Sequence, residues 1–162
     1  MPAHAGYSRP QIALHWIVAV LILWQYLFNE PMAKAWDAIG KGQEPAVNLL
    51  VLTHVLAGAA ILITAFWRLA IIRQRGVPVM IGDNVLLNMA ARATHLGLYA
   101  LMILMPISGA LAWFGGLGAA AGAHNVLKVA LLALVVLHVV GALYHRLWLK
   151  DAVMERMIRA QD

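Results

Sequence analysis

Four long apolar stretches run through the chain and constrain its fold more than any other feature. They cover approximately residues 11–28, 47–72, 86–114 and 125–149. Each is close to the roughly 20 residues that an α-helix needs to cross the hydrocarbon core of a bilayer. Because backbone groups in lipid must form their hydrogen bonds within the segment, we expect four membrane-spanning helices. The predicted fold is an all-α, integral membrane four-helix bundle that forms a single domain over residues 1–162.

The composition agrees with a chain that is surrounded by membrane lipid. Of the 162 residues, 63% are hydrophobic and 12% are charged, against about 45–50% and about 25% in soluble domains. The sequence has no cysteine. This excludes disulfides, thiolate-bound iron–sulfur clusters and covalently attached c-type haem.

The basic residues are distributed unevenly among the connections, and this distribution predicts the orientation. With a cytoplasmic N-terminus, nine lysines and arginines fall on the inner side, whereas the outer side receives only Lys34, Lys41 and Lys128. By the positive-inside rule, both termini are therefore expected in the cytoplasm. The formal net charge of +5 is then a topology signal, and we expect no binding to nucleic acid.

The connections between the apolar stretches are short. Residues 31–45 and 115–123 lie on the predicted outer side, and neither could form a sizeable external domain. Residues 151–162 are mixed in charge, which is typical of a surface helix or tail. The first stretch is long enough to stay in the membrane and lacks a clear cleavage site, so we expect no cleavable signal peptide.

Histidines are unusually frequent in the apolar stretches. Five of the seven lie inside these stretches: His15, His54, His95, His138 and His145. A sixth, His124, opens the fourth stretch, and His4 lies in the N-terminal tail. A single histidine in a membrane helix often does no more than form a hydrogen bond to a neighbouring helix. Several together favour a functional site, because ionisable groups in a bilayer are costly and histidine is a usual axial ligand of haem iron.

The spacing on the fourth stretch places two histidines at two depths. His124 and His138 are 14 residues apart, which is about 40° short of four full turns and a rise of about 21 Å. His15 matches the depth of His138, since the two are about 9 Å and about 12 Å inside the inner edge. His54 is about 12 Å inside the outer edge and has only His124 as a partner. That match requires a tilted fourth helix or an earlier helical start.

Four segments together resemble a known family. They are YSRPQIALHW (7–16), THVLAG (53–58), HLGLYALMILMPISG (95–109) and LHVVGALYHRLWLKD (137–151). They look like the bacterial cytochrome b561 family, and the resemblance covers essentially the whole chain. It implies a multi-pass protein of the bacterial inner membrane that carries two b haems, each ligated by two histidines.

The resemblance also implies which residues hold the haems and which molecules exchange electrons. It implies that His15 and His138 ligate the cytoplasmic-side haem, and that His54 and His124 ligate the periplasmic-side haem. Ubiquinone is the implied redox partner. One characterised type of member is a superoxide oxidase, which passes electrons from periplasmic superoxide to quinone.

Further polar residues near the predicted cytoplasmic side are candidates for the same chemistry. His95 and His145 either contact a quinone and handle its protons, or form hydrogen bonds to haem propionates and neighbouring helices. Arg9, Arg68 and Arg146 are candidate partners of the propionates, or else exposed determinants of topology.

Two functions from different classes fit this sequence. The first is a quinone oxidoreductase of the superoxide oxidase type. In it Lys128, one turn beyond His124, is a candidate for steering a small anionic donor, or else an interfacial lysine whose charge reaches water. The second is a haem-bearing membrane anchor and electron wire for a separate periplasmic redox protein, without chemistry of its own. A haem-free transporter is disfavoured, because the sequence shows no inverted repeat.

Overall fold

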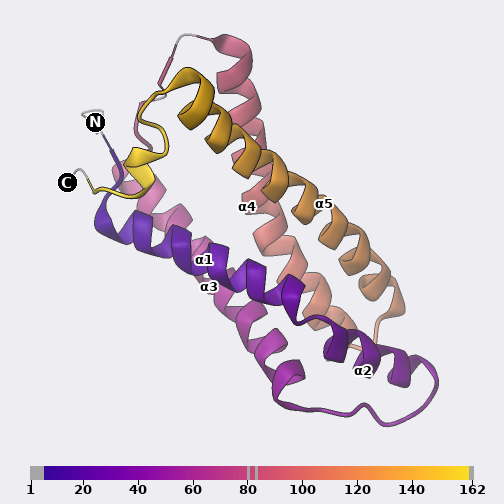
Figure 1. Ribbon diagram of the computed structural model, residues 1–162. Helices are drawn as coiled ribbons and strands as arrows, with labels where there is room; N and C mark the ends of the chain where they lie inside the picture. Colours follow the sequence, from indigo (N-terminus) through magenta and orange to yellow (C-terminus); the bar gives the residue numbers. More distant parts are fainter. Residues whose placement is uncertain (1–5, 80, 83, 161–162) are drawn as a thin grey trace.

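The computed structural model describes residues 6–79, 81–82 and 84–160, and over these it confirms the all-helical membrane fold. His4 lies outside the described residues. Four helices are long and apolar enough to cross a bilayer. They are α1 (Arg9–Leu27), α3 (Leu49–Arg75), α4 (Val85–Trp113) and α5 (Gly118–Tyr144), the last extended by a π-helix (His145–Leu149) (Figure 1).

The helices pack in the order α1, α3, α4, α5, with the closest association between α4 and α5. A buried core lies where α1, α3 and α4 meet, and it contains Val18, Ile22, Ile61, Ala65 and Met102. By contrast, Leu131 is the one buried residue in α5. The other large apolar side chains of α5 are exposed or half-buried, as expected for a helix that faces lipid.

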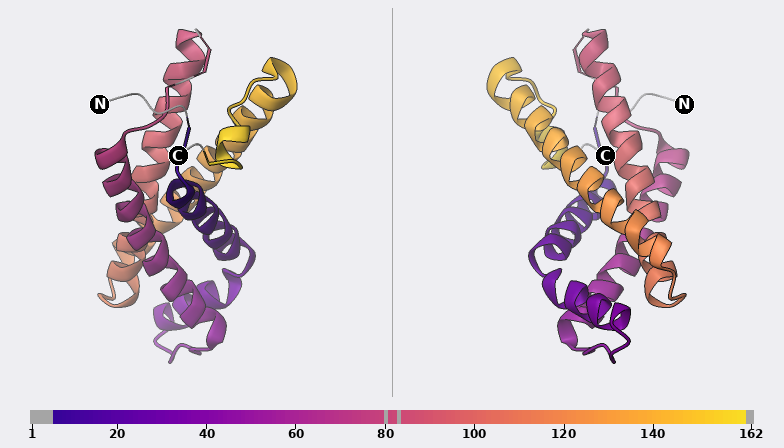
Figure 2. Two further views of the ribbon diagram at one scale, coloured as in Figure 1. Left: turned by 90° about the vertical axis from the view of Figure 1, so that its left-hand side faces the viewer. Right: turned by 90° about the vertical axis from the view of Figure 1, so that its right-hand side faces the viewer.

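Helix α5 converges on α4 toward the connection between them and diverges from it toward the other end, as Figure 2 shows. We call the end where α1 begins and α5 finishes the terminal end, and the opposite end the α2 end. Helix α2 (Glu30–Gly40) lies at the latter (Figure 1).

Side-chain caps explain where three of the long helices begin. The Gln11 side chain accepts a hydrogen bond from the Ser8 backbone N–H at 2.9 Å, just before α1. Asn48 Oδ1 accepts from two backbone N–H groups at the start of α3, and Asn84 Oδ1 accepts from one at the start of α4. Each cap satisfies donors that the first helical turn leaves unpaired. Gly76 follows α3 with a φ of 80°, a left-handed conformation that suits glycine.

The C-terminal segment, predicted to be a surface helix or tail, is a turn followed by a short 3₁₀ helix (Glu155–Met157). Two hydrogen bonds tie it to the bundle. Trp16 Nε1 donates to the carbonyl of Met157 at 2.9 Å, and the Arg156 guanidinium donates to the carbonyl of Val79 at 2.6 Å. The segment therefore connects α1 with the chain that follows α3.

Two helical features differ from the sequence-based expectation. Helix α5 begins at Gly118, seven residues before the predicted start of that stretch, so His124 lies in its second turn. This is the earlier helical start that pairing His124 with His54 required. Helix α2 was predicted only as a connection, although Glu30 and Pro31 in its first turn are ordinary signals of a helix start.

Candidate functional site

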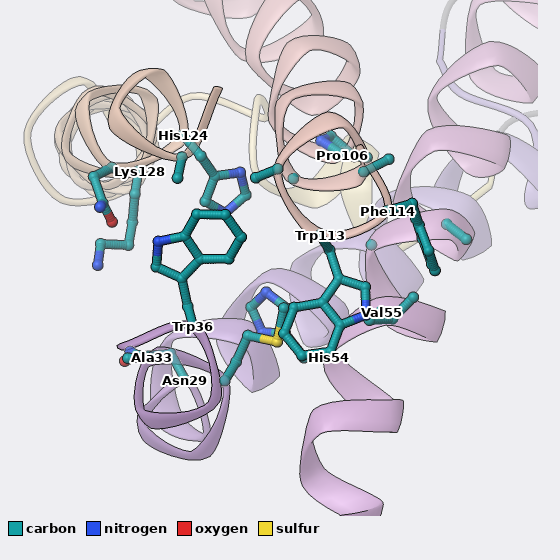
Figure 3. Close-up of a pocket in the computed structure, with 18 of the residues that line it drawn as sticks. Asn29, Ala33, Trp36, His54, Val55, Pro106, Trp113, Phe114, His124 and Lys128 are labelled. Carbon is teal, nitrogen blue, oxygen red and sulfur yellow. The ribbon is translucent and has the colours of Figure 1, made fainter. Parts of the chain in front are cut away.

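A cavity of about 380 Å³ opens between α2, α3, α4 and α5 near the α2 end. Figure 3 shows the rings of His54, His124, Trp36 and Trp113 gathered around this space. Its remaining lining is mostly apolar and includes the small residues Gly58, Ala59, Gly109 and Ala110. A concave apolar cavity of this volume with a few convergent polar groups is typical of a site for a small molecule or cofactor.

The His124 ring is held by two contacts to α4. Its Nδ1 lies 3.0 Å from the backbone carbonyl of Met105 and 3.2 Å from the hydroxyl of Ser108. Because a carbonyl can only accept, Nδ1 carries the hydrogen in this arrangement and Nε2 keeps its lone pair. A histidine oriented in this way is prepared to bind a metal through Nε2.

A glycine leaves the space that the His124 ring occupies. A Cβ atom at Gly109 would lie 3.1 Å from Cε1 and 3.2 Å from Nδ1 of that ring. These distances are tighter than ordinary contacts, so the ring and any larger residue at position 109 compete for one space. Here α4 supplies both the acceptor that orients His124 and the gap that admits it.

On the other side of the cavity, His54 is oriented by its surroundings less completely. Its Nδ1 is buried and has no hydrogen-bond partner within the described part of the chain. The backbone carbonyl of the same residue accepts a hydrogen bond from Gln25 Nε2 at 2.9 Å. A buried imidazole nitrogen without a partner is costly. His54 and His124 line the same cavity, and two imidazoles are the donor set of a b-type haem.

Three histidines from three helices cluster toward the terminal end. The His138 ring centroid is 6.0 Å from that of His15 and 5.2 Å from that of His95. Two opposed imidazoles on one metal atom have centroids about 6 Å apart, given metal–nitrogen bonds of about 2 Å and about 1 Å from nitrogen to ring centre. The His15–His138 separation matches this value more closely than the His95–His138 separation does.

Arg68 on α3 has neutral hydrogen-bond partners near this cluster. Its Nε donates to the Tyr99 hydroxyl at 3.1 Å, and its NH1 donates to the Gln11 carbonyl at 3.0 Å. No carboxylate among the described residues forms an ion pair with it. Burial raises the pKa of Tyr7, just outside the membrane span, and the nearby Arg68 charge opposes that shift. This half-buried guanidinium is a suitable partner for an anion such as a haem propionate.

Arg9 and Arg146 have a different setting from Arg68. Arg9 is the first residue of α1, and Arg146 lies in the π-helix; both are exposed. Their exposure agrees with the interpretation that they determine topology.

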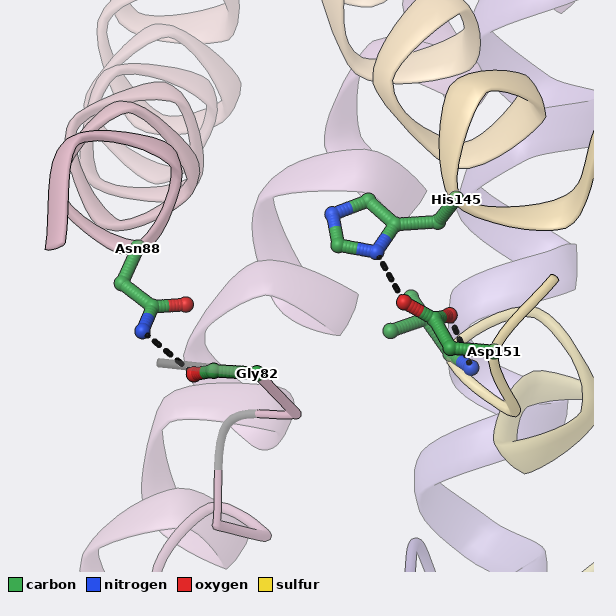
Figure 4. A network of polar contacts seen from close by, with 5 residues as sticks. Gly82, Asn88, His145 and Asp151 are labelled. Carbon is green, nitrogen blue, oxygen red and sulfur yellow. Dashed lines mark hydrogen bonds and ion pairs between the residues drawn. The ribbon is translucent and has the colours of Figure 1, made fainter. Parts of the chain in front are cut away.

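His145 makes a hydrogen-bond contact with a carboxylate that the sequence did not predict. Its Nδ1 lies 2.6 Å from Oδ2 of Asp151, and the two side chains are 18% and 17% exposed (Figure 4). The chain turns back just after the π-helix, where the Asp151 backbone N–H donates to the His145 carbonyl at 3.2 Å. Lys150, between them, has a φ of 51°. The six-residue separation gave no helical reason to pair these side chains, so sequence reasoning missed Asp151.

The three lysines of the α2 end fall into two groups. Lys34 in α2 and Lys41 directly after it each form an i,i+4 ion pair, with Glu30 at 2.7 Å and with Asp37 at 2.6 Å respectively. The hydrogen bond from Lys34 lowers the pKa of Glu30 below its usual value. Lys128 instead lines the cavity beside His54 and His124, and its ammonium has no carboxylate partner among the residues described.

Comparison with known proteins matches this chain to a family model and to curated relatives. A family model described as prokaryotic cytochrome b561 matches residues 6–160. A curated protein of Cereibacter sphaeroides named cytochrome b562 is 40% identical to this chain over 162 residues. The alignment covers 98% of this chain and 99% of that relative.

Proposed function

The chain belongs to the prokaryotic cytochrome b561 family, and we propose that it is a di-haem b-type cytochrome that moves electrons across the inner membrane. Family membership and four candidate spans make it a multi-pass bacterial membrane protein with a role in electron transfer. Beyond that, we infer a periplasmic donor, with superoxide the best candidate, and ubiquinone as the acceptor within the membrane.

Two histidine pairs at two levels of one bundle carry this proposal. His15 and His138 lie 6.0 Å apart by ring centroids at the terminal end, and His54 and His124 line one cavity near the α2 end. Each pair joins two different helices. When bound, a bis-histidine b haem supplies one-electron transfer without an open position on the iron. The protein therefore supplies ligands, an apolar environment and a path between two levels.

The remaining polar residues support the pair at the terminal end. Arg68 is the best candidate to neutralise propionates, since its known partners are a hydroxyl and a carbonyl. We infer that the terminal end is cytoplasmic, because the basic residues concentrate there. The cavity near the α2 end then lies toward the periplasm, where an external donor arrives.

Lys128 is a candidate for steering an anionic donor toward the cavity. Lys34 and Lys41 are compensated by their own acidic partners, so Lys128 supplies the cationic charge at the cavity lining. A positive charge beside an apolar site raises the local concentration of anions. Superoxide, a small anion, would benefit from this attraction.

Replacing Lys128 with glutamine is expected to lower the second-order rate of superoxide oxidation by about tenfold at low salt. It should also weaken the dependence of that rate on ionic strength, because the attraction is electrostatic. Stopped-flow mixing with superoxide measures both quantities. Lys34→Gln is the matched control and should change little; equal effects of the two substitutions would contradict steering by Lys128.

His145 and Asp151 are candidates for proton transfer to quinone at the cytoplasmic side. Quinone reduction consumes protons as well as electrons, and a histidine oriented by a carboxylate is a common proton donor. Asp151 fixes the Nδ1 side of the ring at 2.6 Å and leaves Nε2 to face a substrate. His95 is in contact with His138, so we assign it to the surroundings of the inner haem.

Asp151→Asn is expected to lower the rate at saturating quinone by about 100-fold, with haem content and spectra unchanged. An amide cannot stabilise the imidazolium that forms when the histidine carries a proton. Asp151→Glu, which keeps the charge, should restore part of the rate. Steady-state quinone reduction against pH measures the effect, and an unchanged rate in Asp151→Asn would remove this pair from proton transfer.

The proposed function as a whole is tested by reduced-minus-oxidised visible spectra of the detergent-purified protein, with haem per chain measured as the pyridine haemochrome. Two low-spin b haems are expected, followed by superoxide-dependent reduction of quinone. No haem would overturn the electron-transfer function. Haem reduction only in the presence of a co-purifying periplasmic protein would favour an anchor and electron wire.

A further inference from the structure

Two buried polar atoms without partners lie on adjacent side chains of α1 and α3. Among the described residues, Gln25 Oε1 and His54 Nδ1 are the buried side-chain nitrogen or oxygen atoms that make no hydrogen bond. Both residues line a small cavity of about 60 Å³ beside the larger one. Gln25 Oε1 is a hydrogen-bond acceptor, and His54 Nδ1 can carry a hydrogen and donate it, so the two atoms are complementary.

The Gln25 side chain is already attached to the residue that carries the second of these atoms. Its Nε2 donates to the backbone carbonyl of His54 at 2.9 Å, which fixes the amide next to this histidine. Gly58, one turn further along α3, lies beside the same amide, since a Cβ there would be in ordinary contact with Gln25 Nε2 at 3.6 Å. A glutamine in an apolar span is otherwise costly, and this contact is the reason for its position.

The facing histidine shows what His54 lacks. His124 Nδ1 has an acceptor in the Met105 carbonyl at 3.0 Å, whereas His54 Nδ1 has none. Histidines that bind metals almost always donate their second ring N–H to such an acceptor, which sets the tautomer and raises the basicity of the ligand. Gln25 Oε1 is the free acceptor beside His54.

We propose that Gln25 is a positioning residue for the outer haem, accepting a hydrogen bond from His54 Nδ1–H through Oε1 when His54 Nε2 ligates iron. This inference rests on the proposed outer haem site. One amide would then hold His54 at two points, its carbonyl and its ring. The hydrogen bond strengthens electron donation by His54 and thus stabilises the ferric state.

Redox titration of Gln25 variants of the full-length protein tests this role. Gln25→Leu removes the acceptor and should shift the reduction equilibrium of the outer haem at least tenfold toward the ferrous state, a rise of about 59 mV. Gln25→Glu supplies a stronger acceptor and should shift the same haem in the opposite direction. The outer haem is identified as the one that His54→Ala lacks.

The controls separate this role from a merely structural one. Tyr26→Phe removes a neighbouring hydrogen bond from α1 to the Lys128 carbonyl and should leave both potentials unchanged. Loss of the outer haem from Gln25→Leu, with a lowered potential in Gln25→Glu, would also agree with the proposal. Shifts of one sign in both Gln25 variants, or two unchanged potentials, would overturn it. A wild-type protein without the outer haem would overturn the proposed function itself.

Discussion

Replacing His138 with alanine is expected to reduce the haem content from two per chain to one and to stop electron transfer from an outer donor to quinone. His138 is the central member of the terminal-end cluster, with His15 and His95 at ring-centroid distances of 6.0 Å and 5.2 Å. Alanine offers no ligand at this position, and no other described histidine of α5 lies at the same depth, since His124 is about 21 Å away along the helix.

Haem per chain and optical titration measure this result, and two further variants make it specific. His15→Ala should lose the same haem as His138→Ala. His95→Ala should keep both haems, because the His15–His138 separation matches two opposed imidazoles on one iron better than the His95–His138 separation does. If His95→Ala loses a haem and His15→Ala does not, the assignment of the inner ligands is wrong.

Gly109→Val is expected to remove the outer haem, or to lower its affinity by about 10–100-fold, without altering a ligand. The new side chain would begin 3.1 Å from the His124 ring. That ring cannot move away freely, because its Nδ1 is held by Met105 and Ser108 on the same helix as Gly109. The substitution therefore turns the Nε2 lone pair out of line or breaks the hydrogen bonds that orient it.

A second glycine provides the control for this prediction. Gly122 lies two residues before His124 on α5, and a Cβ there would meet nothing within 4 Å. Gly122→Val should keep two haems per chain. The measurement is the pyridine haemochrome together with the low-spin spectrum of the remaining haem. Two intact haems in Gly109→Val would mean that His124 does not ligate iron in the orientation seen here.

Much of the fold was predictable from local pattern. The four spans follow from apolar stretches of bilayer length, and the structure places helices on all of them. The fixed rise and repeat of a helix place His124 and His138 at two depths on one face of α5. The family resemblance, confirmed over residues 6–160, was visible for the same reason, in short motifs within single helices.

The helix bounds were less predictable than the spans. Residues 118–124 are rich in glycine and alanine, which made them resemble a loop, yet they form the first turns of α5. The residue of this segment that contacts α4 closely is His124, whose ring lies against Gly109. A sequence pattern contains no information on that neighbour, and so the starting residue of α5 depended on tertiary contact.

By itself, the sequence determined a membrane bundle of four helices with histidines at two depths. The reason is that the helical repeat and the length needed to cross a bilayer are both properties of one continuous segment. Only the tertiary structure decided which side chains meet across helices. It gathered His15, His95 and His138 into one cluster, brought Gln25 to His54 and joined Asp151 to His145. Such contacts depend on how helices rotate and cross, which side-chain packing sets between segments distant in the chain.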